Sequence, residues 1–175
     1  MRKLFLALSL AGIPAMAADM YTFTISNPVN VTSPAGSMTG WGYSIHNESS
    51  TYWLVTTNLT SDVFQHATPD NIFDFPDVAP GATVTLPYDP APPPSGLYQI
   101  LWDQNAPAGF VNTGSFTLSA EWWNGDPLSG GVFVSAAPDA SQPYSATLTP
   151  EPATIGSAAI FFSACCAAGF LRRLS

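Results

Sequence analysis

The sequence predicts an all-β fold: an antiparallel β-sandwich, with an N-terminal signal peptide before it and a C-terminal transmembrane helix after it. Three observations support this prediction. Apolar and polar residues alternate in short runs through the middle of the chain. The same region is rich in Thr, Ser, Gly and Pro, which favour strands and turns over helices. Long uninterrupted apolar runs occur only at the two ends of the 175 residues.

The alternating runs define eight expected strands, because a two-residue period places one face of a strand in a core and the other in solvent. The alternation is strict in four runs and shorter or mixed in four others. The strict runs are 21–26, 41–46, 115–122 and 144–148, and the mixed ones are 52–57, 82–86, 97–102 and 131–135. Gly, Pro, Asn and Asp punctuate them at fairly regular spacing, which is typical of a sandwich.

The first segment, residues 1–17, has the three parts of a secretory signal peptide. Two basic residues follow Met1, and an apolar core comes next. Ala15 and Ala17 then form a small-residue cleavage site of the A-x-A type. The apolar core is too short to span a membrane comfortably. We therefore expect a signal peptidase to cut after Ala17, leaving Ala18 as the mature N-terminus.

The last segment contains a predicted membrane span at about 153–171. These nineteen residues carry no charge, and at helical rise they cover about 28 Å, close to one hydrocarbon thickness. Arg172 and Arg173 follow at once as a basic tail. Because arginines next to a span stay on the cytoplasmic side, the body of the chain is expected outside the cell.

The tripeptide Pro150-Glu151-Pro152 stands just before that span. Together with the single span and the terminal arginines, it resembles the PEP-CTERM protein-sorting signal of bacteria. The resemblance covers residues 150–175 and implies recognition near the tripeptide by an exosortase, a membrane-embedded transpeptidase. The implied sequence of events is an inner-membrane intermediate, removal of the anchor, and a body that is released or attached at the surface. Two prolines around a Glu also enforce an extended backbone, which a protease-like site can grip.

The body, residues 18–149, has an unusual charge distribution. All four basic residues of the chain lie in its ends, and eleven of its twelve acidic residues lie in the body, Glu151 being the other. A nucleic-acid partner is therefore excluded, since such binding depends on cationic side chains. The only cysteines are Cys165 and Cys166 in the predicted span, so the body has no disulfide and no thiol nucleophile.

The segment 78–86 is similar to a turn-and-strand motif of immunoglobulin-like bacterial domains. The Cys and Trp pattern of antibody domains is absent, so both an immunoglobulin-like and a jelly-roll sandwich stay open. The Asn-x-Ser/Thr triplets at Asn30, Asn47 and Asn58 are expected in surface turns.

Few residues in the body suggest chemistry. The two histidines fall in no metal-ligand spacing, and no G-x-S-x-G is present, so we expect neither catalytic residues nor a cofactor. Asp70, Asp74 and Asp77 place three carboxylates in one expected loop, which leaves a calcium site open beside the simpler interpretation as solvated turn residues.

The pair Trp122-Trp123 next to Glu121 raises a sugar-binding or glycosidase interpretation, since exposed tryptophans stack on sugar rings and carboxylate pairs carry glycoside hydrolysis. The alternation predicts that Trp122 points into the core and leaves Trp123 as the ligand candidate.

The expected function is that of an exported, exosortase-processed protein of the cell surface or exopolysaccharide matrix, structural or interacting and without enzymatic activity. Its expected partners are the secretion machinery with signal peptidase, the exosortase, and surface polysaccharide. Two alternatives stay open: an extracellular carbohydrate-binding module and a small secreted hydrolase.

Overall fold

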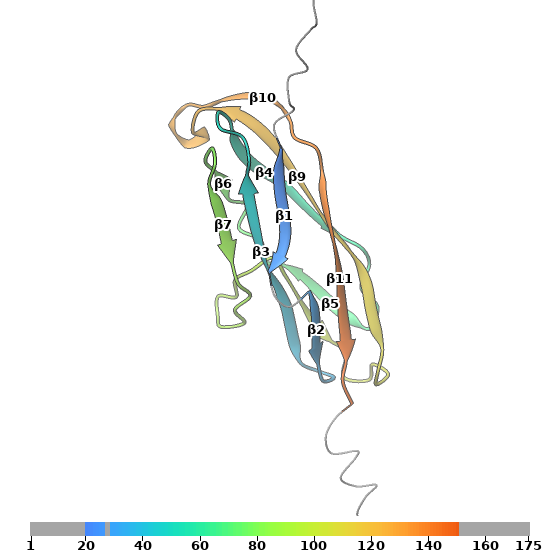
Figure 1. Cartoon of the computed structure of the whole chain (residues 1–175). Coiled ribbons are helices and arrows are strands. Elements are labelled where there is room, and N and C mark those ends of the chain that lie inside the picture. The colour runs from blue at the N-terminus through green and yellow to red at the C-terminus, as the bar shows by residue number, and fades with distance from the viewer. Residues whose placement is uncertain (1–19, 27–28, 151–175) are drawn as a thin grey trace, which may run out of the picture.

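Two β-sheets packed face to face make up residues 20–26 and 29–150, the part of the chain that the computed structural model describes (Figure 1). This confirms the all-β prediction. The predicted signal peptide with its cleavage site, Glu151 and Pro152, the predicted span and the two terminal arginines lie outside the described residues. Within the described part, no helix is long and apolar enough to cross a membrane.

The first sheet has the order β1-β3-β8-β5, with β7 paired to β3, and the second has the order β2-β11-β9-β4-β6, with β10 paired to β9. The strands of the first sheet are β1 (Tyr21–Ser26), β3 (Met38–Asn47), β8 (Tyr98–Trp102), β5 (Ala67–Asn71) and β7 (Thr83–Leu86). Those of the second are β2 (Asn30–Ser33), β11 (Ala140–Leu148), β9 (Val111–Asn124), β4 (Trp53–Ser61), β6 (Asp77–Val78) and β10 (Val132–Ala136). One 3-10 turn, η1 (Pro127–Ser129), joins β9 to β10.

All eight expected runs coincide with strands, and three further strands were not expected: β2, β5 and β6. The prediction of a purely antiparallel arrangement is wrong at one edge, where β2 runs parallel to β11 from the pair Asn30–Ser145 to the pair Ser33–Leu148. The chain leaves the first sheet after β1 and joins the second sheet as β2, which sets β2 in the same direction as the last strand.

Aromatic rings fill the space between the sheets. Trp41 of β3 is fully buried, and its ring centroid lies 5.2 Å from that of Phe116 on β9 and 5.2 Å from that of Tyr144 on β11. Phe64 stacks on Tyr144 at 4.9 Å. The Trp41 indole nitrogen donates a hydrogen bond to the Val29 carbonyl at 3.1 Å, so the one polar atom of this side chain is satisfied. The inward residues of most of the alternating runs, together with Phe64 from the connection between β4 and β5, thus supply the core.

Gly40 of β3 permits a close approach of the neighbouring strand. A Cβ at this position would lie 2.5 Å from the Tyr98 carbonyl oxygen and 2.5 Å from the Tyr88 ring. A side chain there would force β3 and β8 apart, so a residue without a Cβ is required.

Asn47, expected in a surface turn, is instead completely buried at the end of β3. Its side-chain nitrogen donates to the carbonyls of Tyr52 (2.8 Å) and Val78 (2.9 Å), and its oxygen accepts from the Ser49 backbone nitrogen (3.0 Å). Because β3 belongs to the first sheet and Val78 to the second, this amide ties the two sheets together. Asn30 and Asn58 are exposed, but they lie in strands β2 and β4 and not in the expected turns.

Replacing Asn47 with Ala removes this tie and leaves buried backbone groups of Ser49 and Val78 without partners. We expect a loss of about 2–4 kcal/mol in the free energy of unfolding. Equilibrium urea unfolding followed by tryptophan fluorescence measures it. Asn58→Ala is the matched control, because this exposed amide is expected to change stability by less than about 0.5 kcal/mol. Equal midpoints for the two variants would contradict the assigned role.

Candidate functional site

Trp53, Trp123 and Phe133 form a row across three neighbouring strands on the outer face of the second sheet. Trp53 of β4 is paired with Trp123 of β9, and Trp123 is paired with Phe133 of β10. Leu54, which follows Trp53, and Trp122, which precedes Trp123, are buried in the core, so Trp53 and Trp123 point outward. The predicted inward Trp122 and outward Trp123 are therefore confirmed, with Trp123 half-buried rather than fully exposed. We call Trp53, Trp123 and Phe133 the aromatic row.

Trp123 is held in place by two contacts. Its indole nitrogen donates to Glu121 Oε2 at 3.1 Å, two residues earlier on the same face. Its ring meets that of Phe133 edge to face, with centroids 6.4 Å apart and planes at 82°. Phe133 keeps half of its surface exposed. The two rings consequently make a right-angled corner and not a flat platform.

Small uncharged polar side chains line much of the outer face beyond the row. Thr117 of β9 is paired with Thr60 on one side and Ser141 on the other, and the Thr117 and Ser141 hydroxyl oxygens lie 3.1 Å apart. The Thr57 hydroxyl donates to the Ser119 carbonyl at 3.2 Å. This hydroxyl-bearing face continues from the aromatic row toward the start of β9. The outward residues of β9 are Val111, Thr113, Ser115, Thr117, Ser119, Glu121 and Trp123.

Asp77 lies beside the row. It is paired with Val55 on β4, and Val55 is paired in turn with Glu121 on β9. Burial, and secondly the negative charge of Asp126 near η1, raise the pKa of the Asp77 carboxyl above its usual value.

The structure does not bring the three calcium candidates together. Asp70 belongs to β5 of the first sheet and accepts a hydrogen bond from Gln99 Nε2 at 2.8 Å, whereas Asp77 belongs to β6 of the second. Asp74 accepts a hydrogen bond from the Tyr43 hydroxyl, and burial followed by this bond raises the pKa of Tyr43 well above its usual value. The expectation of one shared loop is wrong, because two of the three residues pair into opposite sheets. In the described part of the chain, no three His, Cys, Asp or Glu side chains are grouped as metal ligands.

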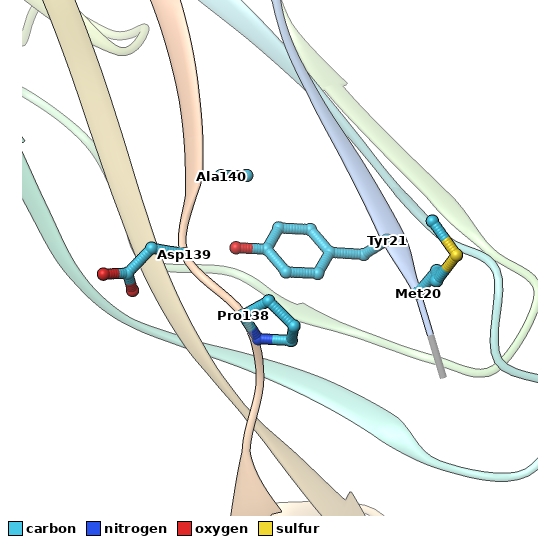
Figure 2. A pocket seen from close by; sticks show the side chains of 5 residues that line it. All are labelled: Met20, Tyr21, Pro138, Asp139 and Ala140. Carbon is cyan, nitrogen blue, oxygen red and sulfur yellow. The ribbon is translucent and has the colours of Figure 1, made fainter. Parts of the chain in front are cut away.

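Three cavities were characterised on the described surface. The one in Figure 2, of about 100 Å³, lies where β1 faces the connection from β10 to β11 and is lined by Tyr21, Asp139 and three small or apolar neighbours. The Tyr21 hydroxyl donates to the Leu118 carbonyl at 3.1 Å across the two sheets. Burial, and then the Asp139 charge, raise the pKa of Tyr21 to about 12, so this phenol stays protonated and structural at neutral pH.

The other two cavities, of about 220 and 210 Å³, are also smaller than usual small-molecule pockets. The larger contains no carboxylate and lies next to Pro150. The smaller of these two contains one carboxylate, that of Asp70.

The two histidines lie apart, each with its own contacts. His46 Nδ1 lies 2.9 Å from Thr83 Oγ1 on the edge strand β7, and the exposed His66 ring packs against Phe110 at 4.7 Å. His46 belongs to β3, and His66 lies just before β5.

The sequence identified Trp123 but not Trp53 or Phe133 as members of a site. The buried Leu54 was the available signal, since an inward residue at 54 sends 53 outward. Comparisons with protein-family models, with curated proteins and with solved structures find no match for this chain.

Replacing Asp77 with Asn is expected to stabilise the protein at pH 7. A carboxyl whose folded-state pKa is raised resists ionisation in the folded state, so its charge lowers stability above that pKa. This penalty disappears as the pH falls through the folded and then the unfolded pKa. We expect a gain of a few tenths of a kcal/mol at pH 7, none near pH 3, and a smaller gain in high salt.

Urea unfolding at pH 7 and pH 3 measures the effect. Asp103→Asn, an exposed carboxylate, removes the same charge and reports the general relief of repulsion. An Asp77→Asn gain no larger than that of the control at pH 7 contradicts the local explanation.

Proposed function

We propose that this chain is an exported structural or interaction protein of the cell surface or exopolysaccharide matrix, without enzymatic activity. In this proposal, residues 1–17 direct secretion and residues 153–171 hold the chain in the inner membrane. An exosortase then acts at Pro150-Glu151-Pro152, and the sandwich is released or attached outside the cell.

One observation carries the proposal: the backbone of the last strand stays hydrogen-bonded to the sandwich up to the residue before the tripeptide. The Leu148 nitrogen donates to the Phe110 carbonyl at 2.9 Å and the Thr149 nitrogen to the Ser33 carbonyl at 3.0 Å. The next residue, Pro150, has no N–H to donate and is exposed. Cleavage after this point therefore breaks none of the backbone hydrogen bonds of the described strands. A processing site needs this combination of an exposed chain and an independent fold.

The direction of the strands also fits display outside a membrane. β1 starts at one pole of the sandwich and β11 ends at the other (Figure 1). The start of β9 pairs with the end of β11, while its far end pairs with β10. The end of the sandwich next to the tripeptide is thus separated from the aromatic row by the length of β9. This strand has fourteen residues, and the separation is about 40 Å.

We infer an immunoglobulin-like sandwich in preference to a jelly roll. The order β1-β3-β8-β5 corresponds to the A-B-E-D sheet of immunoglobulin domains, and the neighbours β4, β9 and β11 correspond to the C-F-G sheet.

The hydrolase alternative has less support than the binding alternative. Glycoside hydrolysis uses two carboxyl groups across a cleft. Each of the three characterised cavities contains one carboxylate or none. The carbohydrate-binding alternative is favoured by the aromatic row.

Glu151→Ala tests the processing step. In the native host, wild-type protein is expected to lose the segment after the tripeptide and to leave the inner membrane. The variant keeps its apolar span and should accumulate at full length in the membrane, because the change lies outside the span and costs no insertion energy. Intact-mass spectra of membrane and extracellular fractions distinguish these outcomes.

Two controls separate recognition from anchoring. Thr149→Ala changes the neighbouring side chain but keeps the tripeptide, and it should be processed as wild type. Deletion of residues 153–175 should give secreted protein without a membrane stage. If wild-type protein is found at full length at the surface, and the Glu151→Ala variant has the same mass and location, the tripeptide is not a processing site. It would then be only a rigid spacer before the span.

A further inference from the structure

We propose that Trp53, Trp123, Phe133 and Glu121 form a binding site for a neutral polysaccharide on the outer face of the second sheet. The site does not depend on processing at the tripeptide, because all four residues lie on strands β4, β9 and β10 of the second sheet.

The aromatic row supplies the apolar part of such a site. A pyranose ring presents C–H groups on its faces and hydroxyls around its rim, so the face of an aromatic ring is its natural partner. Trp123 and Phe133 stand at 82° to each other. One ring offers a face for stacking and the other forms a wall beside it. This corner fits one flexible polysaccharide chain better than the flat surface of a crystalline polymer.

Glu121 supplies the polar part. A carboxylate has about four acceptor positions on its two oxygens, and the Trp123 indole occupies one of them. The remaining positions can accept hydrogen bonds from the hydroxyls of a sugar stacked on the ring. The same bond fixes the orientation of Trp123 before binding, which lowers the entropy lost when the ligand arrives.

The hydroxyl-bearing face extends the site along β9. Ser119, Thr117 and Ser115 point to the same side as Glu121 and Trp123. Hydroxyls both donate and accept, so they match the hydroxyls of a polyol without demanding a charge. A polysaccharide chain anchored at the aromatic row can therefore continue along this face.

Charge decides which polysaccharide fits. The described residues contain no Lys or Arg, and Glu121, Asp77 and Asp126 surround the row. Polymers with carboxylate or sulfate groups meet repulsion there, with no cation to compensate. Neither the hydroxyls nor the rings require a positive ligand. The site is therefore suited to a polysaccharide without charged groups.

Self-association along the free edge of β10 is the competing explanation for the exposed apolar residues. Val132, Phe133 and Val134 are 65%, 50% and 44% exposed on this edge strand. A bulge interrupts the pairing of β10 with β9 between Phe133 and Ser135. Bulges on edge strands disrupt the regular array that a second strand needs. The row is therefore better explained by a ligand than by a second copy.

Affinity electrophoresis tests the proposal on the intact chain. The protein is purified in a polyoxyethylene detergent, since a detergent with a sugar head group would compete. It is then run in native gels containing hydroxyethyl cellulose, mixed-linkage β-glucan or dextran as neutral probes, with alginate and glycol chitosan as charged ones. We expect retardation by at least one neutral probe and none by alginate.

The variants assign that retardation to the row. Trp123→Ala should weaken apparent affinity at least about tenfold, as for removal of an aromatic anchor. Trp53→Ala, Phe133→Ala and Glu121→Gln should weaken it several-fold, and Trp123→Phe less than Trp123→Ala. Leu128→Ser and Val63→Ser are the matched controls, because these side chains are 88% and 87% exposed but lie off the row. They should bind as wild type.

A second measurement uses only wild-type protein, so it does not depend on whether the variants fold. Wild-type protein is treated with N-bromosuccinimide with and without the neutral probe, and oxidised tryptophans are mapped by mass spectrometry. The probe should protect Trp53 and Trp123, while the buried Trp41 and Trp102 stay unreactive in both conditions.

Four results overturn the proposal. They are no retardation of wild type by any neutral probe, equal retardation of wild type and folded Trp123→Ala, retardation by glycol chitosan alone, and protection of Trp123 in a dimer without added polysaccharide.

Discussion

Aromatic contact between the two sheets is the interaction on which the rest of this structure depends. The described residues contain no Lys or Arg, so no carboxylate of the sandwich can be neutralised by one. Cohesion must come from uncharged groups. Trp41, Phe116 and Tyr144 meet at the centre with centroid distances of 4.5–5.2 Å. At one end of the core, the buried Asn47 amide links the two sheets by its hydrogen bond to the Val78 carbonyl. A surface of one sign of charge is compatible with this core because none of its contacts relies on attraction between ions.

The alternation of residues predicted the long strands that bury one face, and also β7 and β10, which have no buried residue. It missed three short strands. The five residues of β5, Ala67–Asn71, do not alternate between apolar and polar types, and four of them are exposed. β6 has two residues, and β2 contributes a single large apolar side chain, Val31, to the core. The parallel pairing of β2 with β11 could not be predicted, because it is fixed by which sheet the chain joins after β1 and not by any local pattern.

The candidate site was predictable one residue at a time but not as a group. An inward Trp122 implied an outward Trp123, and that inference holds. The partners of Trp123 depend on strand register, which brings Trp53 from seventy positions earlier and Phe133 from across a bulged hairpin. Asn47 illustrates the opposite error. Its residue type and its Ser49 neighbour suggested a turn, but its amide is buried and donates to the Val78 carbonyl, which belongs to the other sheet.

The opposite placement of the two poles has a mechanical consequence. A load applied between the aromatic row and Thr149 runs along β9 and β11. Hydrogen bonds in a sheet lie across the strands, so such a load shears the eight residue pairs of β9 with β11 together with the four of β2 with β11. Bonds sheared as a set resist force far better than bonds opened one after another, as in a zipper. The parallel strand β2 adds a second shear-loaded row on the other side of β11, at the point where tension enters the sandwich.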